Sequence, residues 1–136
     1  MSEELLAGDA MTVEALKKIF DDAYMETSID SDGDLVVKDG YRCFMRPDQD
    51  GRLLAACSIF GAKEGASQQA KLEFVNRVND EVKLIRASVM DDGRYFFDFY
   101  IPIEGGITKK CVVLAVRRFL SCLRSAMEQD TDDIVA

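Results

Sequence analysis

The chain of 136 residues contains no histidine. This absence removes the commonest general base, the commonest transition-metal ligand and every nucleophile pair that depends on histidine. The four cysteines form no Cys-x-x-Cys pair, so a zinc site would require all four to converge without the usual ligand spacing. The sequence therefore predicts no catalytic residues, no metal site and no cofactor, and we expect a protein that is not an enzyme.

Long apolar runs are also missing. None approaches the roughly 18–20 residues that span a bilayer, and the acidic start at residues 1–4 is not followed by the apolar segment of a secretory signal. Without an export signal, the four cysteines are expected to be reduced thiols, mostly buried as small apolar side chains. We therefore expect a cytoplasmic protein with no membrane partner.

Two short motifs resemble ligand-binding loops but lack the decisive residues. Acids alternate from Asp30 to Asp34 as in an EF-hand, yet Leu35 and Tyr41 stand where that loop needs glycine and glutamate. Gly105 and Gly106 precede a predicted helix without the spacing of a phosphate-binding loop. Together with Lys109 they support an alternative hypothesis, in which this helix N-terminus binds an anion or small ligand, or serves a small enzyme.

The net charge of −8 is concentrated near the two ends of the chain. Residues 1–11 and 128–136 contain seven acids, whereas all 17 lysines and arginines lie between them with the remaining 18 acids. A nearly neutral middle argues against non-specific binding to nucleic acid or anionic membranes. We predict a flexible lead-in at 1–11, one domain at 12–127 and an acidic tail at 128–136.

Hydrophobic periodicity predicts an α+β domain with an antiparallel sheet of about five strands. The expected order is helix, three strands, helix, two strands, helix. Thr12, Ser67 and Thr108 are suited to cap the helices. Asn79 is expected to bond backbone groups in the turn that leaves the second helix, with a ligand contact as the alternative. Helices are predicted at about 12–25, 67–81 and 108–127, and strands at about 35–38, 41–46, 53–60, 85–90 and 95–101.

The strand at 95–101 contains five of the twelve aromatic residues and places apolar groups on both faces. Phe96 and Tyr100 point opposite to Tyr95, Phe97 and Phe99. A sheet covered by helices on one side should alternate cleanly between apolar and polar residues. The second apolar face is therefore covered by other parts of the chain, or it binds a protein partner or a second copy in a homodimer. Phe96 and Tyr100 are our candidate partner-binding residues.

The last helix carries a basic stripe. Lys110, Arg117 and Arg124 recur every seven residues, and no acid occurs between Gly105 and Met127. This stripe is either a solvated face or a docking surface for something acidic, such as the tail at 128–136. We take Arg117 and Arg124 as a possible charged rim for the partner-binding face.

Four short motifs together are typical of one protein family. They are Asp34–Val37 followed by Gly40, Phe74-Val75-Asn76-Arg77-Val78-Asn79, Asp91–Arg94, and Ile101 to Thr108. Through these motifs, the sequence from residue 12 onward resembles the YbjN-like family of bacterial proteins, described as sensory-transduction regulators. The resemblance implies a fold like that of type III secretion chaperones, with three helices around an antiparallel sheet, and often dimeric, protein-binding members. It implies no catalytic residues.

Overall fold

Three α-helices form where their caps were predicted. The computed structural model describes residues 4–48 and 50–136. The first helix, α1 (Val13–Asp22), begins after Thr12, whose hydroxyl accepts a hydrogen bond from the Ala15 N–H at 3.1 Å. Ser67 and Thr108 cap the other two helices in the same way, satisfying N–H groups that have no partner within a helix. These are α2 (Gln68–Glu81) and α3 (Lys109–Glu128).

The main sheet is antiparallel and has six strands in the order β2-β3-β4-β5-β7-β6. The sequence predicted five of them and missed β2, because Glu26-Thr27-Ser28-Ile29 is a short, mostly polar strand at an edge. Gly40 (φ +77°) and Gly93 (φ +89°) adopt the left-handed conformation that the turns before β4 and β7 require. The strands are β2 (Glu26–Ile29), β3 (Leu35–Asp39), β4 (Tyr41–Asp48), β5 (Leu53–Phe60), β6 (Arg86–Val89) and β7 (Tyr95–Pro102).

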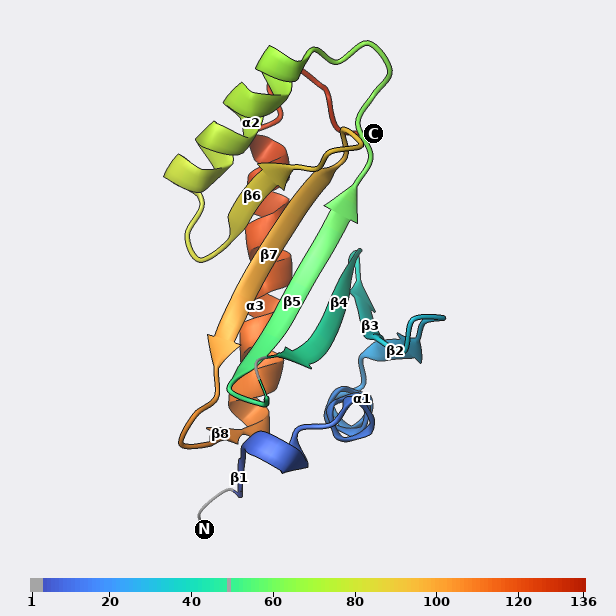
Figure 1. Cartoon of the computed structure of the whole chain (residues 1–136), viewed down its shortest axis with the longest axis vertical. Helices are drawn as coiled ribbons and strands as arrows, with labels where there is room; N and C mark the ends of the chain where they lie inside the picture. The colour runs from blue at the N-terminus through green and yellow to red at the C-terminus, as the bar shows by residue number, and fades with distance from the viewer. Residues whose placement is uncertain (1–3, 49) are drawn as a thin grey trace.

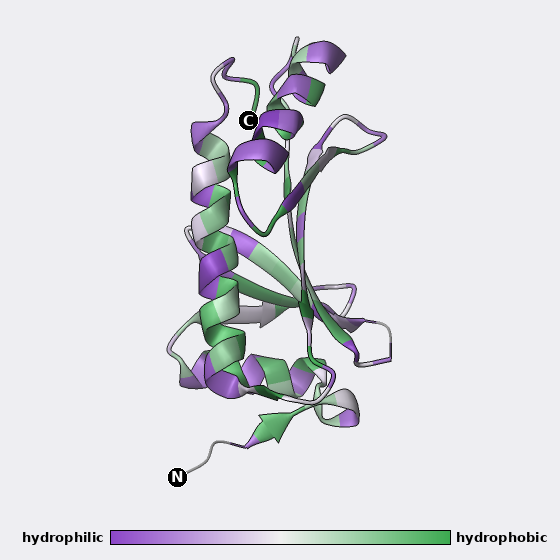
Figure 2. Ribbon diagram, turned by 90° about the vertical axis from the view of Figure 1, so that its left-hand side faces the viewer, coloured by the Kyte–Doolittle hydropathy of each residue, from purple (hydrophilic) through white to green (hydrophobic). Residues whose placement is uncertain are grey.

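The helices lie on one face of this sheet and enclose the core. Figures 1 and 2 show α3 as a layer behind the strands, with α1 and α2 near opposite ends of the molecule. Tyr95 and Phe97 on β7 are fully buried and meet Phe74 of α2 edge to face, at centroid distances of 5.2 and 6.3 Å. Phe99 stacks on Phe119 of α3 at 6.1 Å. The aromatic strand is therefore the centre of the core on its helix side.

The N-terminal segment pairs with the start of α3. Strand β1 (Leu5–Leu6) is antiparallel to β8 (Ile107–Thr108), which leads into the helix. A single 3-10 turn, Gly8–Ala10, then connects to α1, and Met11 is buried in the core. Leu5 lies so close to Gly106 that a Cβ at that glycine would be 2.8 Å from the Leu5 Cβ.

The C-terminal residues fold back against α2 and the end of β5. Ile134 and Val135 are buried, and the Asp130 carboxylate accepts hydrogen bonds from both of their N–H groups at 2.8 and 3.0 Å. The Tyr95 hydroxyl donates to the Ile134 carbonyl at 3.1 Å. Asp133 pairs with Lys63, and other contacts of this segment involve Arg77. Two acids of this segment, Asp133 and Asp132, thus pair with Lys63 and Arg77, and no ion pair joins the segment to the basic stripe of α3 in the described chain.

No helix in residues 4–48 and 50–136 combines the length and the apolar character needed to cross a membrane.

Candidate functional site

The face of the sheet turned away from the helices carries a continuous apolar surface, which we call the open face. The strand register places Val36, Phe44 and Cys57 side by side across β3, β4 and β5, and no helix or strand of the described chain lies over them (Figures 1 and 2). Tyr100 is 40% exposed and Ile59 38% exposed. The apolar members of the open face are Val36, Phe44, Ala55, Cys57, Ile59, Phe96 and Tyr100.

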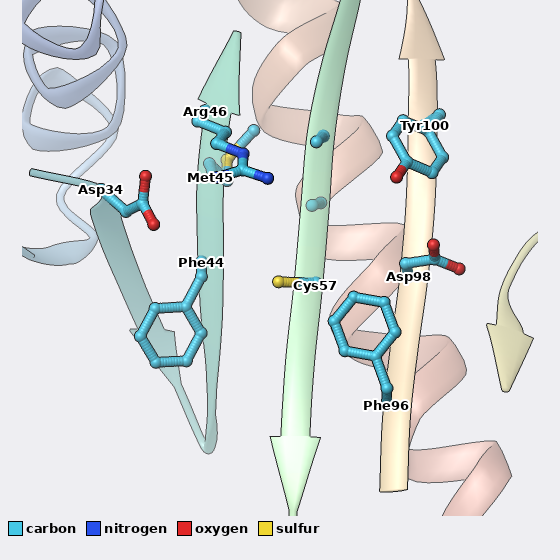
Figure 3. Close-up of a pocket in the computed structure, with 10 residues that line it drawn as sticks. Asp34, Phe44, Met45, Arg46, Cys57, Phe96, Asp98 and Tyr100 are labelled. Carbon is cyan, nitrogen blue, oxygen red and sulfur yellow. The ribbon is translucent and has the colours of Figure 1, made fainter. Parts of the chain in front are cut away.

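The centre of the open face is hollowed. Figure 3 shows Phe44 and Phe96 on either side of Cys57, with Tyr100 farther along β7. The hollow has a volume of about 150 Å³, and Asp34 and other polar side chains contribute to its lining. An apolar cavity of roughly this size holds one benzene-sized group. The hollow therefore fits a single apolar or aromatic side chain of a partner better than it fits a cofactor.

An ion pair fixes the position of Tyr100. Asp98 is 4% exposed, and it accepts hydrogen bonds from Arg86 Nε at 2.9 Å and from Nη2 at 2.5 Å. These hydrogen bonds and the charge of Asp98 raise the pKa of Arg86. The guanidinium lies 5.6 Å from the centre of the Tyr100 ring, within the range of a cation–π interaction. Arg86 of β6 thus contacts both the Asp98 carboxylate and the Tyr100 ring of the neighbouring strand β7.

The cysteines do not supply a reactive thiolate to this site. Burial raises the pKa of the half-buried Cys57 thiol, and it raises the pKa of the fully buried Cys43 thiol strongly. A thiol with a raised pKa is a poor nucleophile at neutral pH. Within the described part of the chain, no three cysteine, aspartate or glutamate side chains gather as metal ligands.

The structure separates the residues that sequence analysis combined into one site. Phe96 and Tyr100 lie on the open face as expected, whereas Arg117 and Arg124 belong to α3, in the layer on the other side of the sheet. The two arginines therefore cannot form the rim of the open face. That rim is charged, but its cations include Arg46 and Arg86, beside the hollow and the aromatic strand, and Lys38 and Arg42, beside Val36 and Phe44.

The alternative anion site is partly covered by the chain itself. Leu5 packs over Gly106, and β1 pairs with the backbone of Thr108 immediately before Lys109. Gly105 has open space around it, but it stands at the turn rather than at the first helical N–H groups. The arrangement therefore leaves less exposed backbone for an anion than the Gly105-Gly106 pair alone suggested.

The side of the hollow that β4 contributes was not predicted from the sequence. Phe44 and Arg46 on β4 alternate with the buried Cys43 and Met45, and this alternation was the available signal. The alternation is a weak signal, because Phe44 stands between two other apolar residues, Cys43 and Met45, and the sequence does not show which of the three faces the core. Only the register of β4 on β5 shows that Phe44 and Cys57 are neighbours.

The two edges of the sheet differ. At β6, the Asn79 side chain of α2 accepts a hydrogen bond from the Ala87 N–H at 2.8 Å and donates one to the Ala87 carbonyl at 3.0 Å. The predicted backbone contact of Asn79 thus exists, but its target is the edge of β6 rather than the exit turn. At the opposite edge, β2 pairs only with β3 in the described chain. Pairing groups are therefore occupied at one edge and available at the other.

This arrangement defines a class: an α+β protein with three helices on one face of an antiparallel sheet, like the type III secretion chaperones. The chaperone SycH of Yersinia pestis, solved with a fragment of YscM2, is 16% identical with a TM-score of 0.57, over 86% of this chain and 98% of that one. The structure of a HopA1-SchA chaperone–effector complex matches at 14% identity and a TM-score of 0.55, over 84% of this chain and 88% of that one. At such identities the likeness concerns the fold.

A sequence model of the YbjN family, described as "Putative bacterial sensory transduction regulator", matches residues 12–134, and the chain belongs to this family. The crystal structure of YbjN from E. coli, described as a "putative transcription regulator", has a TM-score of 0.77 at 13% identity. That match covers 98% of this chain and 99% of the E. coli chain. A search among curated proteins finds no match.

Proposed function

We propose that the protein is a non-enzymatic, cytoplasmic protein-binding module, acting as a regulator or chaperone-like adapter through its open face. The observation that carries this proposal is the hollow between Phe44 and Phe96, on a sheet face that no helix or strand of the described chain covers. The partner is a protein segment that inserts an apolar side chain there, or a second copy of the chain in a homodimer.

The composition of the open face supports a protein partner. Aromatic residues and arginine are enriched at protein interfaces, and the strongest contacts cluster in desolvated pockets within a polar rim. Here, a half-buried aromatic hollow lies beside Asp34, Arg46 and the Arg86–Asp98 pair. The related folds of SycH and SchA were solved with protein partners, which is compatible with this role.

A pair of substitutions on one strand tests the proposal. Phe96→Ser with Tyr100→Ser removes two rings from the open face, and both are at least partly exposed, so the fold should survive. Phe97→Ser is the matched control, because Phe97 is fully buried and its truncation should cost roughly 3–5 kcal/mol of stability. The measurements are thermal unfolding, sedimentation for self-association, and affinity capture from the native cell lysate.

We expect the double variant to unfold at nearly the wild-type temperature, and to capture no partner or to sediment as a single copy. The Phe97→Ser control should instead unfold at a much lower temperature. A double variant that captures the same proteins and sediments like the wild type would contradict the proposal. No contact in the structure favours the anion-binding alternative, since Leu5 covers Gly106. A large thermal shift with phosphate or nucleotides would nevertheless support it.

A further inference from the structure

Helix α3 concentrates positive charge on its solvent side. Its 20 residues include five lysines and arginines, and its only acid is Glu128, the last residue. Within the described chain none of the five cations forms an ion pair, whereas Lys17, Lys18, Lys63, Arg77, Arg86 and Arg94 do. In a chain of net charge −8, this helix face is an electropositive exception that the fold itself does not neutralise.

The same face contains exposed leucines. Leu114 is 50% exposed and lies in a shallow hollow with Arg117, Arg118 and Ser121. A second hollow shares Arg118 and Ser121 with the first and continues to Leu84, which is 62% exposed. We call this combined surface the α3 groove, lined by Leu84, Leu114, Arg117, Arg118 and Ser121. Glu81 and Lys83 line its far end and offset each other in charge.

Leu84 stands in an unfavourable conformation for its residue type. Its φ of +75° lies in the left-handed region, which costs a non-glycine residue about 1–2 kcal/mol. The side chain is mostly exposed, and it is not among the apolar side chains that pack on the core in the described structure. Glycine would satisfy this turn at lower cost. The Leu84 side chain therefore adds little stability to the isolated fold to offset this conformational cost. Such a position is expected for a side chain that makes its contacts with a partner.

We propose that the α3 groove binds an acidic amphipathic segment of a partner protein. Leu84 and Leu114 contact the apolar side of that segment, while Arg117, Arg118 and the neighbouring cations of α3 pair with its carboxylates. Most of the groove residues belong to α3, and this helix lies on the side of the sheet opposite the open face (Figure 2), so both surfaces can be occupied together. The net charge of −8 opposes binding to extended polyanions such as DNA and anionic membranes, which reach well beyond the groove. A short acidic segment confined to the groove is instead within a Debye length, about 8–10 Å, of the α3 cations and is largely screened from the more distant acids.

The test uses the full chain and a synthetic probe. The probe is a fluorescein-labelled helical peptide of about five turns, with leucines on one side and glutamates on the other. A peptide with lysine in place of every glutamate is the comparison. We expect the acidic peptide to bind the wild type and the basic peptide not to bind. Reversing the two groove charges, Arg117→Glu with Arg118→Glu, should weaken peptide binding about tenfold at low salt. The difference between this variant and the wild type should be smaller at high salt, because salt screens the charges.

Two controls separate this groove from general electrostatics. Lys38→Glu with Arg42→Glu makes the same change in net charge on the sheet side of the molecule, and should leave peptide binding nearly unchanged. Leu84→Gly should weaken peptide binding several-fold while unfolding at the same or a higher temperature, because glycine suits the φ of +75°.

The proposal fails if the sheet-side reversal weakens binding as much as the groove reversal, or if Leu84→Gly binds the peptide like the wild type. It also fails if phosphatidylserine vesicles or duplex DNA bind the wild type more tightly than the acidic peptide does, and lose that binding in Arg117→Glu with Arg118→Glu. Binding of the peptide to the Phe96→Ser, Tyr100→Ser variant should be unchanged, which keeps this test independent of the open face.

Discussion

Replacing Asn79 with alanine should destabilise the β6 edge of the sheet. The expected loss of unfolding free energy follows from the two hydrogen bonds that the Asn79 side chain makes to the backbone of Ala87. The amide of Asn79 makes both of its hydrogen bonds to Ala87, one to the N–H and one to the carbonyl. A hydrogen bond in a folded protein contributes about 0.5–1.5 kcal/mol net. Loss of both should therefore lower the free energy of unfolding by about 1–3 kcal/mol.

Asn76 provides a matched control on the same helix. It lies one turn earlier in α2, is exposed, and makes no hydrogen bond within the described residues. Alanine is a better helix former than asparagine by roughly half a kcal/mol, and both substitutions gain that amount. The difference between Asn79→Ala and Asn76→Ala therefore isolates the two bonds to Ala87.

Urea unfolding of both variants measures the difference in free energy, and hydrogen exchange adds a local readout. The Ala87 amide should exchange faster in Asn79→Ala than in the wild type or in Asn76→Ala, because its bonding partner is gone. Equal unfolding free energies for the two variants, with unchanged exchange at Ala87, would refute the reasoning and leave the sheet edge without this support.

Two further predictions concern buried polar groups. With a thiol reagent such as Ellman's reagent, the exposed Cys111 should react quickly, Cys57 slowly, and Cys43 only after unfolding. The reason is that burial raises the pKa of the Cys57 and Cys43 thiols. Fast reaction of Cys43 in the folded protein would contradict its enclosed position. Tyr95→Phe removes the hydroxyl that donates to the Ile134 carbonyl, and should cost about 0.5–1.5 kcal/mol in urea unfolding; an unchanged midpoint would show that this bond adds nothing to the docking of the C-terminal segment.

The sequence predicts the elements with strong local signals. Thr12, Ser67 and Thr108 each precede a helical pattern and each caps a helix in the structure. The two-sided aromatic pattern of 95–101 correctly separates Phe97, which is buried, from Tyr100, which is exposed. Such signals are local because a cap depends on three neighbouring residues, and facing depends on the period-two alternation of a strand.

The remaining features depend on contacts between distant segments. The short strand β2 pairs with β3, and its sequence is a weak signal, because Thr27 and Ile29 favour a strand but alternate with Glu26 and Ser28 in a run of only four residues. The backbone of Ile134 is held by two hydrogen bonds, one from the Tyr95 hydroxyl to its carbonyl and one from its N–H to the Asp130 carboxylate. Tyr95 and Ile134 are 39 positions apart in the sequence. Likewise, no spacing in the sequence shows that Arg117 and Phe96 lie on opposite layers. A basic stripe and an aromatic stripe were each visible, but their relative placement follows from how α3 packs on the sheet.

The unequal edges of the sheet limit how copies of this protein could assemble through backbone pairing. Asn79 occupies the outward N–H and carbonyl of Ala87 in β6, so a foreign strand cannot pair with that residue. In the described six-stranded sheet, the edge at β2 is the one without such a side-chain block. Two molecules paired along β2 would each satisfy the outward backbone groups of the other's edge strand. The edges left facing outward would be the two β6 strands, where Asn79 occupies the groups of Ala87. Such growth would stop at two copies instead of propagating into a fibre.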